Sequence, residues 1–228
     1  MRQIVLDTET TGMPVKDGHR IIEIGAVEII NRRLTGNNYH QYINPERAMP
    51  NEAFEVHGLG DDFLRDKPVF ALIAQDFLDF IGDAKLVIHN AAFDMKFLNA
   101  ELGWVKKQAL PWERAIDTLA IARKNFPGSP ASLDALCKRF NVDNSHREKH
   151  GALLDSEILA EVYLHLLGGR QQTLIKEQET VVRVSTQDVK FTAVTNFPSR
   201  SFKASEIEAK AHDDFLEKIN DPIWKMEG

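Results

Sequence analysis

The stretch Ile4-Val5-Leu6-Asp7-Thr8-Glu9-Thr10-Thr11-Gly12 decides the fold of this chain. Its three leading apolar residues predict a short buried strand, and Thr-Thr-Gly predicts the turn that ends it. Because side chains alternate along a strand, Asp7 and Glu9 face one side and Thr8 faces the other. Two carboxylates this close repel each other unless a proton or a metal neutralises them. The stretch therefore predicts a pair of acids at a strand end.

Four interpretations compete for this acidic pair. An aspartic-protease sequence needs glycine two residues after the aspartate, where this chain has Glu9. A helix-loop-helix calcium site needs a bidentate carboxylate at its twelfth position, which here is Gly18. With these two excluded, a site for a hard divalent cation and a pair of solvated surface acids remain, and the stretch alone does not separate them.

Length and composition limit the class of protein. The 228 residues, 43% hydrophobic and 27% charged, predict a soluble globular protein with one well-cored domain plus an appendage, or two small domains. No apolar run approaches the ~20 residues that span a bilayer, and the first residues lack a signal-peptide pattern, so we expect a cytoplasmic protein. The single cysteine, Cys137, lies on an apolar helical stripe and predicts a buried thiol without an intrachain disulfide.

The net charge of −6 argues against a protein that holds duplex nucleic acid through a large basic surface of its own. If nucleic acid is the substrate, metals or a partner must supply the positive charge.

The order of predicted elements indicates the architecture. Strands near residues 4–6, at 20–31 and ending near 43 predict an antiparallel meander, followed by loop or short helical turns at 45–60. A further buried strand is expected at 85–90, and helices are expected at 68–80, 91–102, 117–124, 132–140 and 150–167. Strands first, then strand and helices mixed, predict an α/β fold with a mixed central β-sheet flanked by helices.

The chain changes character after Gly169. Residues 176–203 are mostly polar and predict an extended or mobile linker. Ser205 and Glu208 then predict a capping box at the start of an amphipathic helix, with Trp224 beyond it. A single helix of this kind cannot form a core alone. We therefore expect this C-terminal tail either to fold back on the domain or to dock on another protein.

Three further residues could carry chemistry beside the acidic pair. Asp94 lies in the first turn of the helix after the strand at 85–90, and His150 and Asp155 lie at the start of the last long helix. Five residues turn a helix by about 500°, so the side chains of His150 and Asp155 are not stacked, but both reach one cleft if the helix begins at its rim. Taken singly, each acid is more often a helix cap or a solvated charge.

Together, these motifs resemble the DEDDh family of 3′→5′ exonucleases. The motifs are Asp-x-Glu at a strand end, His-Asn-x-x-Phe-Asp after a second strand, and His-x-x-x-x-Asp on a late helix, and the resemblance extends from Gln3 to about Leu167. It implies an RNase H-like exonuclease fold. The four acids that it implies as metal ligands are Asp7, Glu9, Asp94 and Asp155. The histidine that names the subgroup matches His150.

The resemblance also implies a two-metal mechanism. Four carboxylates without a cysteine suit a hard ion, so we expect two Mg²⁺ or Mn²⁺ ions. Asp7 is expected to bridge them, Glu9 and Asp155 to bind the first ion, and Asp94 to bind the second through water. His150 is expected to take the proton from the attacking water, and a nucleoside 5′-monophosphate is released.

Five segments look more specifically like the proofreading subunits of bacterial replicative DNA polymerases. They are residues 2–12, 21–38, 87–94, 132–137 and 150–163. That likeness places Glu52 and His57, in a Glu-Ala-Phe-x-Val-His-Gly segment, near the terminal nucleotide, in addition to Asp7, Glu9 and Asp155. It implies a DNA 3′ end as substrate, single-stranded or frayed, and no membrane.

The same likeness implies protein partners and a division of the chain. The expected division is an exonuclease domain at 1–169, a clamp-contacting peptide and flexible linker at 170–203, and a segment at 204–228 that binds the catalytic (alpha) subunit of the polymerase. The residues expected to bind the sliding clamp are Gln171, Leu174 and Ile175. Whether a third, small theta-like subunit binds the nuclease domain is left open.

Two other functions remain alternatives. One is a free-standing exonuclease of the same superfamily that acts on RNA ends or short oligonucleotides, and the long tail argues against it. The other is a non-catalytic assembly subunit, and competent side chains at all five chemical positions argue against that.

Overall fold

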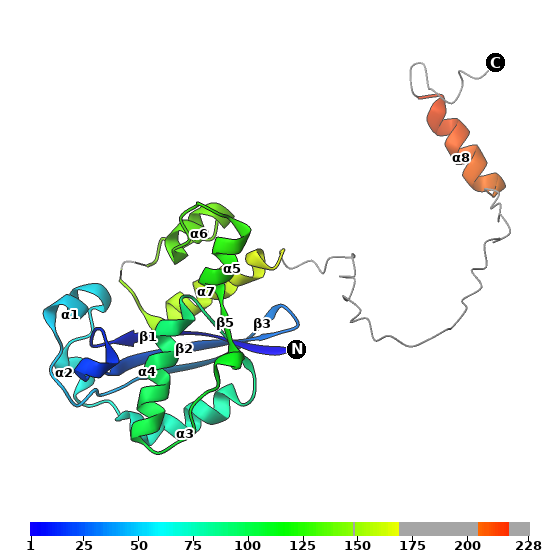
Figure 1. Cartoon of the computed structure of the whole chain (residues 1–228). Helices are drawn as coiled ribbons and strands as arrows, with labels where there is room; N and C mark the ends of the chain where they lie inside the picture. Colours follow the sequence, from blue (N-terminus) through cyan, green and yellow to red (C-terminus); the bar gives the residue numbers. More distant parts are fainter. Residues whose placement is uncertain (148, 169–204, 219–228) are drawn as a thin grey trace, which may run out of the picture. The chain divides into compact units, whose positions relative to one another are not determined.

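The computed structural model describes residues 1–147, 149–168 and 205–218 (Figure 1). Its centre is a five-stranded mixed sheet in the order β3-β2-β1-β4-β5. The strands are β1 (Arg2–Thr10), β2 (Ile21–Ile30), β3 (Arg33–Tyr42), β4 (Lys85–Ile88) and β5 (Ala115–Asp117). β1 pairs antiparallel with β2 and parallel with β4, which confirms the predicted meander and mixed sheet. The sequence did not predict β5, because three residues are too short to show a period.

Eight α-helices occur in the described residues. They are α1 (Asn51–His57), α2 (Asp61–Leu64), α3 (Phe70–Ile81), α4 (Ala91–Trp104), α5 (Thr118–Asn125), α6 (Leu133–Phe140), α7 (Ala152–Leu166) and α8 (Glu206–Leu216). The predicted helices are confirmed with ends displaced by one or two residues. The prediction that the last helix includes His150 is wrong. Gly151 is the N-cap of α7 with an extended backbone, so His150 lies in the loop before the helix.

The alternation of side chains along β1 divides the core into two layers. Ile4 and Leu6 pack with α3 and α4 on one face of the sheet, whereas Val5 packs against α7 on the other. All three side chains are fully buried. Residues that follow Val5 at intervals of two therefore face α7, and residues that follow Leu6 face α4.

The first turn of α7 lies unusually close to β2 at Gly25. A Cβ atom at this glycine would lie 2.1 Å from the Ala152 carbonyl carbon and from the Leu153 nitrogen. The Ser156 hydroxyl also donates to the Gly25 carbonyl oxygen over 2.8 Å. Because Gly25 pairs with Asp7 across the sheet, this contact brings the start of α7 beside the acidic end of β1.

The remaining predictions about local structure divide by region. Cys137 is buried and Ser205 forms the capping box with Glu208 at the start of α8, as predicted. The structure adds that Ser132 caps α6. The predicted linker, the clamp-contacting peptide and Trp224 lie outside the described residues. Within the described ranges, no helix combines the length and the apolar character needed to cross a bilayer.

Candidate active site

The candidate site forms beyond the end of β4, where the neighbouring strand β1 continues. Val5 pairs with Val87, and β4 ends one residue later at Ile88, whereas β1 continues to Thr10. A cleft of about 550 Å³ opens at this point. The residues of the cleft wall include all four predicted metal ligands and the predicted catalytic histidine: Asp7, Glu9, Asp94, Asp155 and His150. The carboxyl ends of adjacent parallel strands are the usual place for a ligand crevice in an α/β sheet.

The acids reach this cleft from both faces of the sheet. Asp7 and Glu9 share the face of Val5 and lie on the α7 side, as the alternation predicts. Thr8 lies on the α4 side, where its hydroxyl donates to Asp94 Oδ1 over 2.7 Å. Asp94 on α4 and Asp155 on α7 are 2% and 3% exposed. The first turns of the two helices therefore both line the cleft beyond the end of β4.

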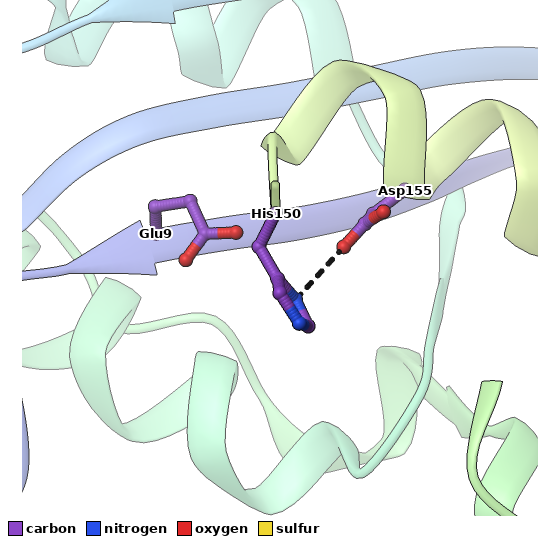
Figure 2. Close-up of side chains that lie close together, drawn as sticks. All are labelled: Glu9, His150 and Asp155. Carbon is purple, nitrogen blue, oxygen red and sulfur yellow. Dashed lines mark ion pairs between the residues drawn. The ribbon is translucent and has the colours of Figure 1, made fainter. Parts of the chain in front are cut away.

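Three of these residues form a compact group of potential metal ligands. One ligand atom from each of Glu9, His150 and Asp155 lies within 4.8 Å of the others. Figure 2 shows Glu9 coming from the strand, Asp155 from the helix, and His150 between them. The His150 Nδ1 atom is 3.4 Å from Asp155 Oδ2, and its backbone N–H donates to the Val56 carbonyl oxygen over 3.3 Å. The second bond ties the loop before α7 to α1.

Burial and crowding raise the pKa values of Asp7, Glu9 and Asp94. Burial, followed by the charges of Asp155 and Glu23, raises the pKa of Glu9 to about 8. Burial raises the pKa of Asp94 to about 7 although the Thr8 hydrogen bond opposes the shift. The pKa of Asp7 is also raised well above its ordinary value, first by burial and then by Asp94 and Glu9. A divalent cation would relieve this repulsion and displace the protons.

Arg147 belongs to the site although no sequence motif marked it. Its Nε atom lies 2.5 Å from Asp155 Oδ1, and its Nη2 atom lies 2.7 Å from Asp155 Oδ2. Nη1 donates to Asp134 over 2.8 Å, and Nη2 lies 2.8 Å from His150 Nδ1. The hydrogen bond to Asp155 raises the pKa of Arg147 further above its usual range. A lone arginine in a polar loop carries no periodic signal, so only the packing shows its role.

Glu52 and His57, the predicted nucleotide contacts, are on α1 and do not line this cleft. Glu52 is exposed, whereas His57 is 5% exposed. His57 Nδ1 accepts a hydrogen bond from the Leu59 N–H over 3.0 Å, and Nε2 makes no hydrogen bond of normal geometry with the described residues. Burial, with the charges of Lys149 and His150, lowers the pKa of His57 to about 4, so the imidazole is neutral at pH 7.

The fold and this site match a known class of nuclease. The family model described as "Exonuclease" matches residues 4–163, a range that contains every residue of the cleft wall. The solved structure of "Exonuclease X in complex with 5′ overhanging duplex DNA" is similar with a TM-score of 0.58 and 26% identity, over 73% of this chain and 91% of that chain. The nuclease domain of 3′hExo, "a DEDDh family member, bound to rAMP", shares the fold with a TM-score of 0.62 and 22% identity, over 73% of this chain and 92% of that one. The family model, the fold and the site thus define an exonuclease whose cleft combines four acids and one histidine.

Relatives that match almost the whole chain identify the kind of exonuclease. "DNA polymerase III subunit epsilon" of Rickettsia conorii is 50% identical over 96% of both chains. The protein with the same name from Escherichia coli K12 is 48% identical over 96% of this chain and 93% of its own length. The chain belongs to the family of DNA polymerase III epsilon subunits, the 3′→5′ exonucleases of that polymerase. This membership confirms the predicted fold class and the predicted resemblance.

Proposed function

We propose that the protein removes mispaired 3′-terminal nucleotides from DNA as 5′-monophosphates, by two-metal-ion hydrolysis, as the proofreading subunit of a replicative polymerase. The observation that carries this proposal is the convergence of four acids from β1, α4 and α7, together with His150, on one cleft. Family membership supports the reaction class. A replication subunit of this kind would work in the cytoplasm.

The residues present fit a pair of hard divalent cations. Their donor atoms are carboxylate oxygens with one imidazole, and burial, aided by neighbouring negative charges, raises the pKa values of Glu9 and Asp94. We assign Asp7 as the shared ligand, Glu9 and Asp155 to the first ion, and Asp94 to the second through water. Bound Mg²⁺ or Mn²⁺ would neutralise the phosphate and activate water for attack.

His150 is assigned as the base that takes the proton of the attacking water. Its ring is about half exposed at the cleft, close to both Glu9 and Asp155 (Figure 2). Imidazole changes charge near neutral pH, which suits proton transfer in the cell.

Glu52 and His57 are assigned to hold the terminal nucleotide. The support from this structure is the Nε2 atom of His57. Because Nδ1 accepts a hydrogen bond, the proton of the neutral ring is on Nε2. This atom makes no hydrogen bond of normal geometry with the described residues, although the Thr10 backbone lies near enough to raise the pKa of the ring. Buried donors are normally satisfied, and a nucleotide oxygen would satisfy this one.

The partners are proposed from the C-terminal part of the chain. We assign 204–228 to the alpha subunit, Gln171, Leu174 and Ile175 to the sliding clamp, and leave a theta-like subunit as a further candidate partner. Support comes from α8, where the apolar side chains of Ile207 and Phe215 are 83% and 58% exposed. Truncation after Leu167 should retain exonuclease activity and lose alpha binding. Deletion of residues 171–175 should lower clamp affinity, and an unchanged affinity would refute that assignment.

The test of the main proposal is digestion of 3′-mispaired and paired DNA primers, and of RNA, with and without a chelator. We expect metal-dependent release of 5′-monophosphates and preference for the mispaired DNA end. Asp7→Ala and Asp155→Ala should abolish release while circular dichroism shows an intact fold. Asp76→Ala, which removes an exposed acid on α3, is the control and should retain activity. Trimming by chelator-treated enzyme would contradict the metal assignment.

A further inference from the structure

Arg147 is the least expected component of the cleft. Its side chain is 9% exposed and is fully engaged with charged or polar groups. Two of its nitrogens bind the two oxygens of Asp155, and a third binds Asp134. Bidentate arginine–carboxylate pairs of this kind are among the strong charge-assisted hydrogen bonds, because two parallel N–H···O bonds form at once. The carboxylate that we assign to the first metal ion is therefore already neutralised by a side chain.

The Arg147 guanidinium also determines which ring nitrogen of neutral His150 carries the proton. A guanidinium has only hydrogen-bond donors, so the short contact from Arg147 Nη2 requires His150 Nδ1 to accept. The proton of the neutral ring is then on Nε2. In this tautomer neither ring nitrogen has a free lone pair for the proton of water. The contact of Nδ1 with Asp155 Oδ2 is longer, 3.4 Å against 2.8 Å, so the Arg147 contact decides the tautomer.

We propose that Arg147 occupies the place of a divalent cation in the metal-free protein and exchanges with the metal, releasing Asp155 and His150 together. A cation that binds the same carboxylate oxygens as the guanidinium would meet a like charge. Exchange therefore makes the catalytic state of His150 depend on metal binding. This inference rests on the proposed metal-dependent function of the cleft.

The surroundings of Arg147 provide a place for it to go. Arg147 is in the loop between α6 and α7, and its second anion, Asp134, belongs to the first turn of α6. The Asp134 side chain is 61% exposed. After release of Asp155, the guanidinium can keep this pair near solvent. The loss of one ion pair is then offset by the metal bonds of Asp155.

The experiment is a titration of the full-length protein with Mn²⁺, followed by calorimetry and by the electron paramagnetic resonance signal of free Mn²⁺. Arg147→Gln removes the competing charge and should bind Mn²⁺ about tenfold more tightly than wild type, which corresponds to about 1.4 kcal/mol. Arg123→Gln is the matched control, because Arg123 lines the same cleft and carries the same charge. It should change the affinity less than about twofold. Equal or weaker Mn²⁺ binding by Arg147→Gln would overturn the proposal.

Thermal unfolding supplies a second readout. Without metal, Arg147→Gln should unfold at a lower temperature than wild type, because the buried carboxylate of Asp155 has lost its partner. Saturating Mn²⁺ should remove most of this difference. A deficit that persists with metal would show that Arg147 is a permanent part of the site and would refute exchange.

A second variant keeps the test decisive if Arg147→Gln does not fold. Arg147→Lys keeps the charge but cannot span both oxygens and the imidazole, so it should bind Mn²⁺ more tightly than wild type by about threefold. No gain in this variant would overturn the proposal. Wild-type protein that binds no Mn²⁺ would refute the metal site itself, whereas binding that is lost in Asp155→Asn but not gained in Arg147→Gln would refute only the exchange.

Discussion

The α4 side and the α7 side of the cleft hold their acids in different ways. Asp94 is buried in the first turn of α4, directly after β4, and accepts a hydrogen bond from Thr8 of the neighbouring strand. Asp155 is equally buried, but its partner Arg147 comes from a loop, and the adjacent His150 is about half exposed. Both acids belong to the first turn of a helix, but a strand hydroxyl binds Asp94, whereas a loop guanidinium binds Asp155. An exchange of partners is thus expected on the α7 side.

The largest effect should come from a change at His150, in the loop before α7. We expect His150→Gln to lower the turnover number by about 10²-fold or more, the usual contribution of a general base. The acidic limb of the pH–rate profile should disappear as well, because glutamine cannot take a proton. Turnover of a single-stranded primer from about pH 5.5 to 8.5 measures both effects. An unchanged profile would mean that another group is the base.

The next effect concerns the contact that positions α7. Gly25→Ala places a methyl group 2.1 Å from backbone atoms of Ala152 and Leu153, so we expect a loss of about 1–3 kcal/mol in the free energy of unfolding. Gly103→Ala in helix α4 is the matched control. Apart from the adjacent residues and the backbone of its own helix, no atom lies within 4 Å of its added Cβ, and alanine should stabilise the helix by about 0.5–1 kcal/mol. Urea denaturation measures both changes. Equal values for the two variants would show that α7 adapts freely at this contact.

A smaller effect is expected on the α4 side. Thr8→Val keeps the side-chain shape and removes the hydrogen bond to Asp94, which favours the ionised carboxylate. The pKa of Asp94 should rise above its value of about 7, and the enzyme should need more metal for half-maximal activity. We expect a shift of less than about tenfold, since one hydrogen bond to a charged group contributes about 1.5–3 kcal/mol, part of which the metal replaces.

Thr8→Ser retains the hydroxyl and is the control for this prediction. Its metal dependence should match that of the wild type. If Thr8→Val also matches the wild type, Asp94 does not need this hydrogen bond to stay ionised.

The smallest effect is a dependence of metal-free stability on pH. The pKa values of Glu9 and Asp94 rise on folding, to about 8 and about 7, so the folded state holds protons that the unfolded state releases. Their stabilisation is complete at low pH and is lost as the pH rises through these values. The pKa values of His57 and His89 fall on folding, so these residues lose stabilisation only as the pH drops below about 6.5.

The window from about pH 6.5 to 8 therefore isolates the acids. With chelator, we expect the melting temperature to fall by about 2–4 °C across this window, measured by calorimetry. Mg²⁺ should raise the melting temperature more at the upper end, because fewer protons then compete with it. Glu9→Gln should flatten the slope. A melting temperature that rises across the window would show that the acids are already ionised without metal.

The sequence by itself determined the α4 side and the acidic end of β1. The apolar run predicted a buried strand. The alternation of side chains predicted the common face of Asp7 and Glu9 and the opposite face of Thr8. A strand followed by a helical period predicted the place of Asp94. These features depend on the backbone geometry of a few neighbouring residues, so local patterns are enough to predict them.

Only the tertiary structure decided the α7 side. It showed that His150 precedes the helix, that Arg147 binds both Asp155 and His150, and that Gly25 allows α7 to approach β2. The Gly25 contact joins residues far apart in the chain, and the Ser156 hydroxyl likewise binds a carbonyl 131 positions away. Arg147 is only eight residues from Asp155, but it lies in a loop that shows no periodic pattern. No local period encodes such contacts, because they are determined by how closely a helix and a sheet can pack.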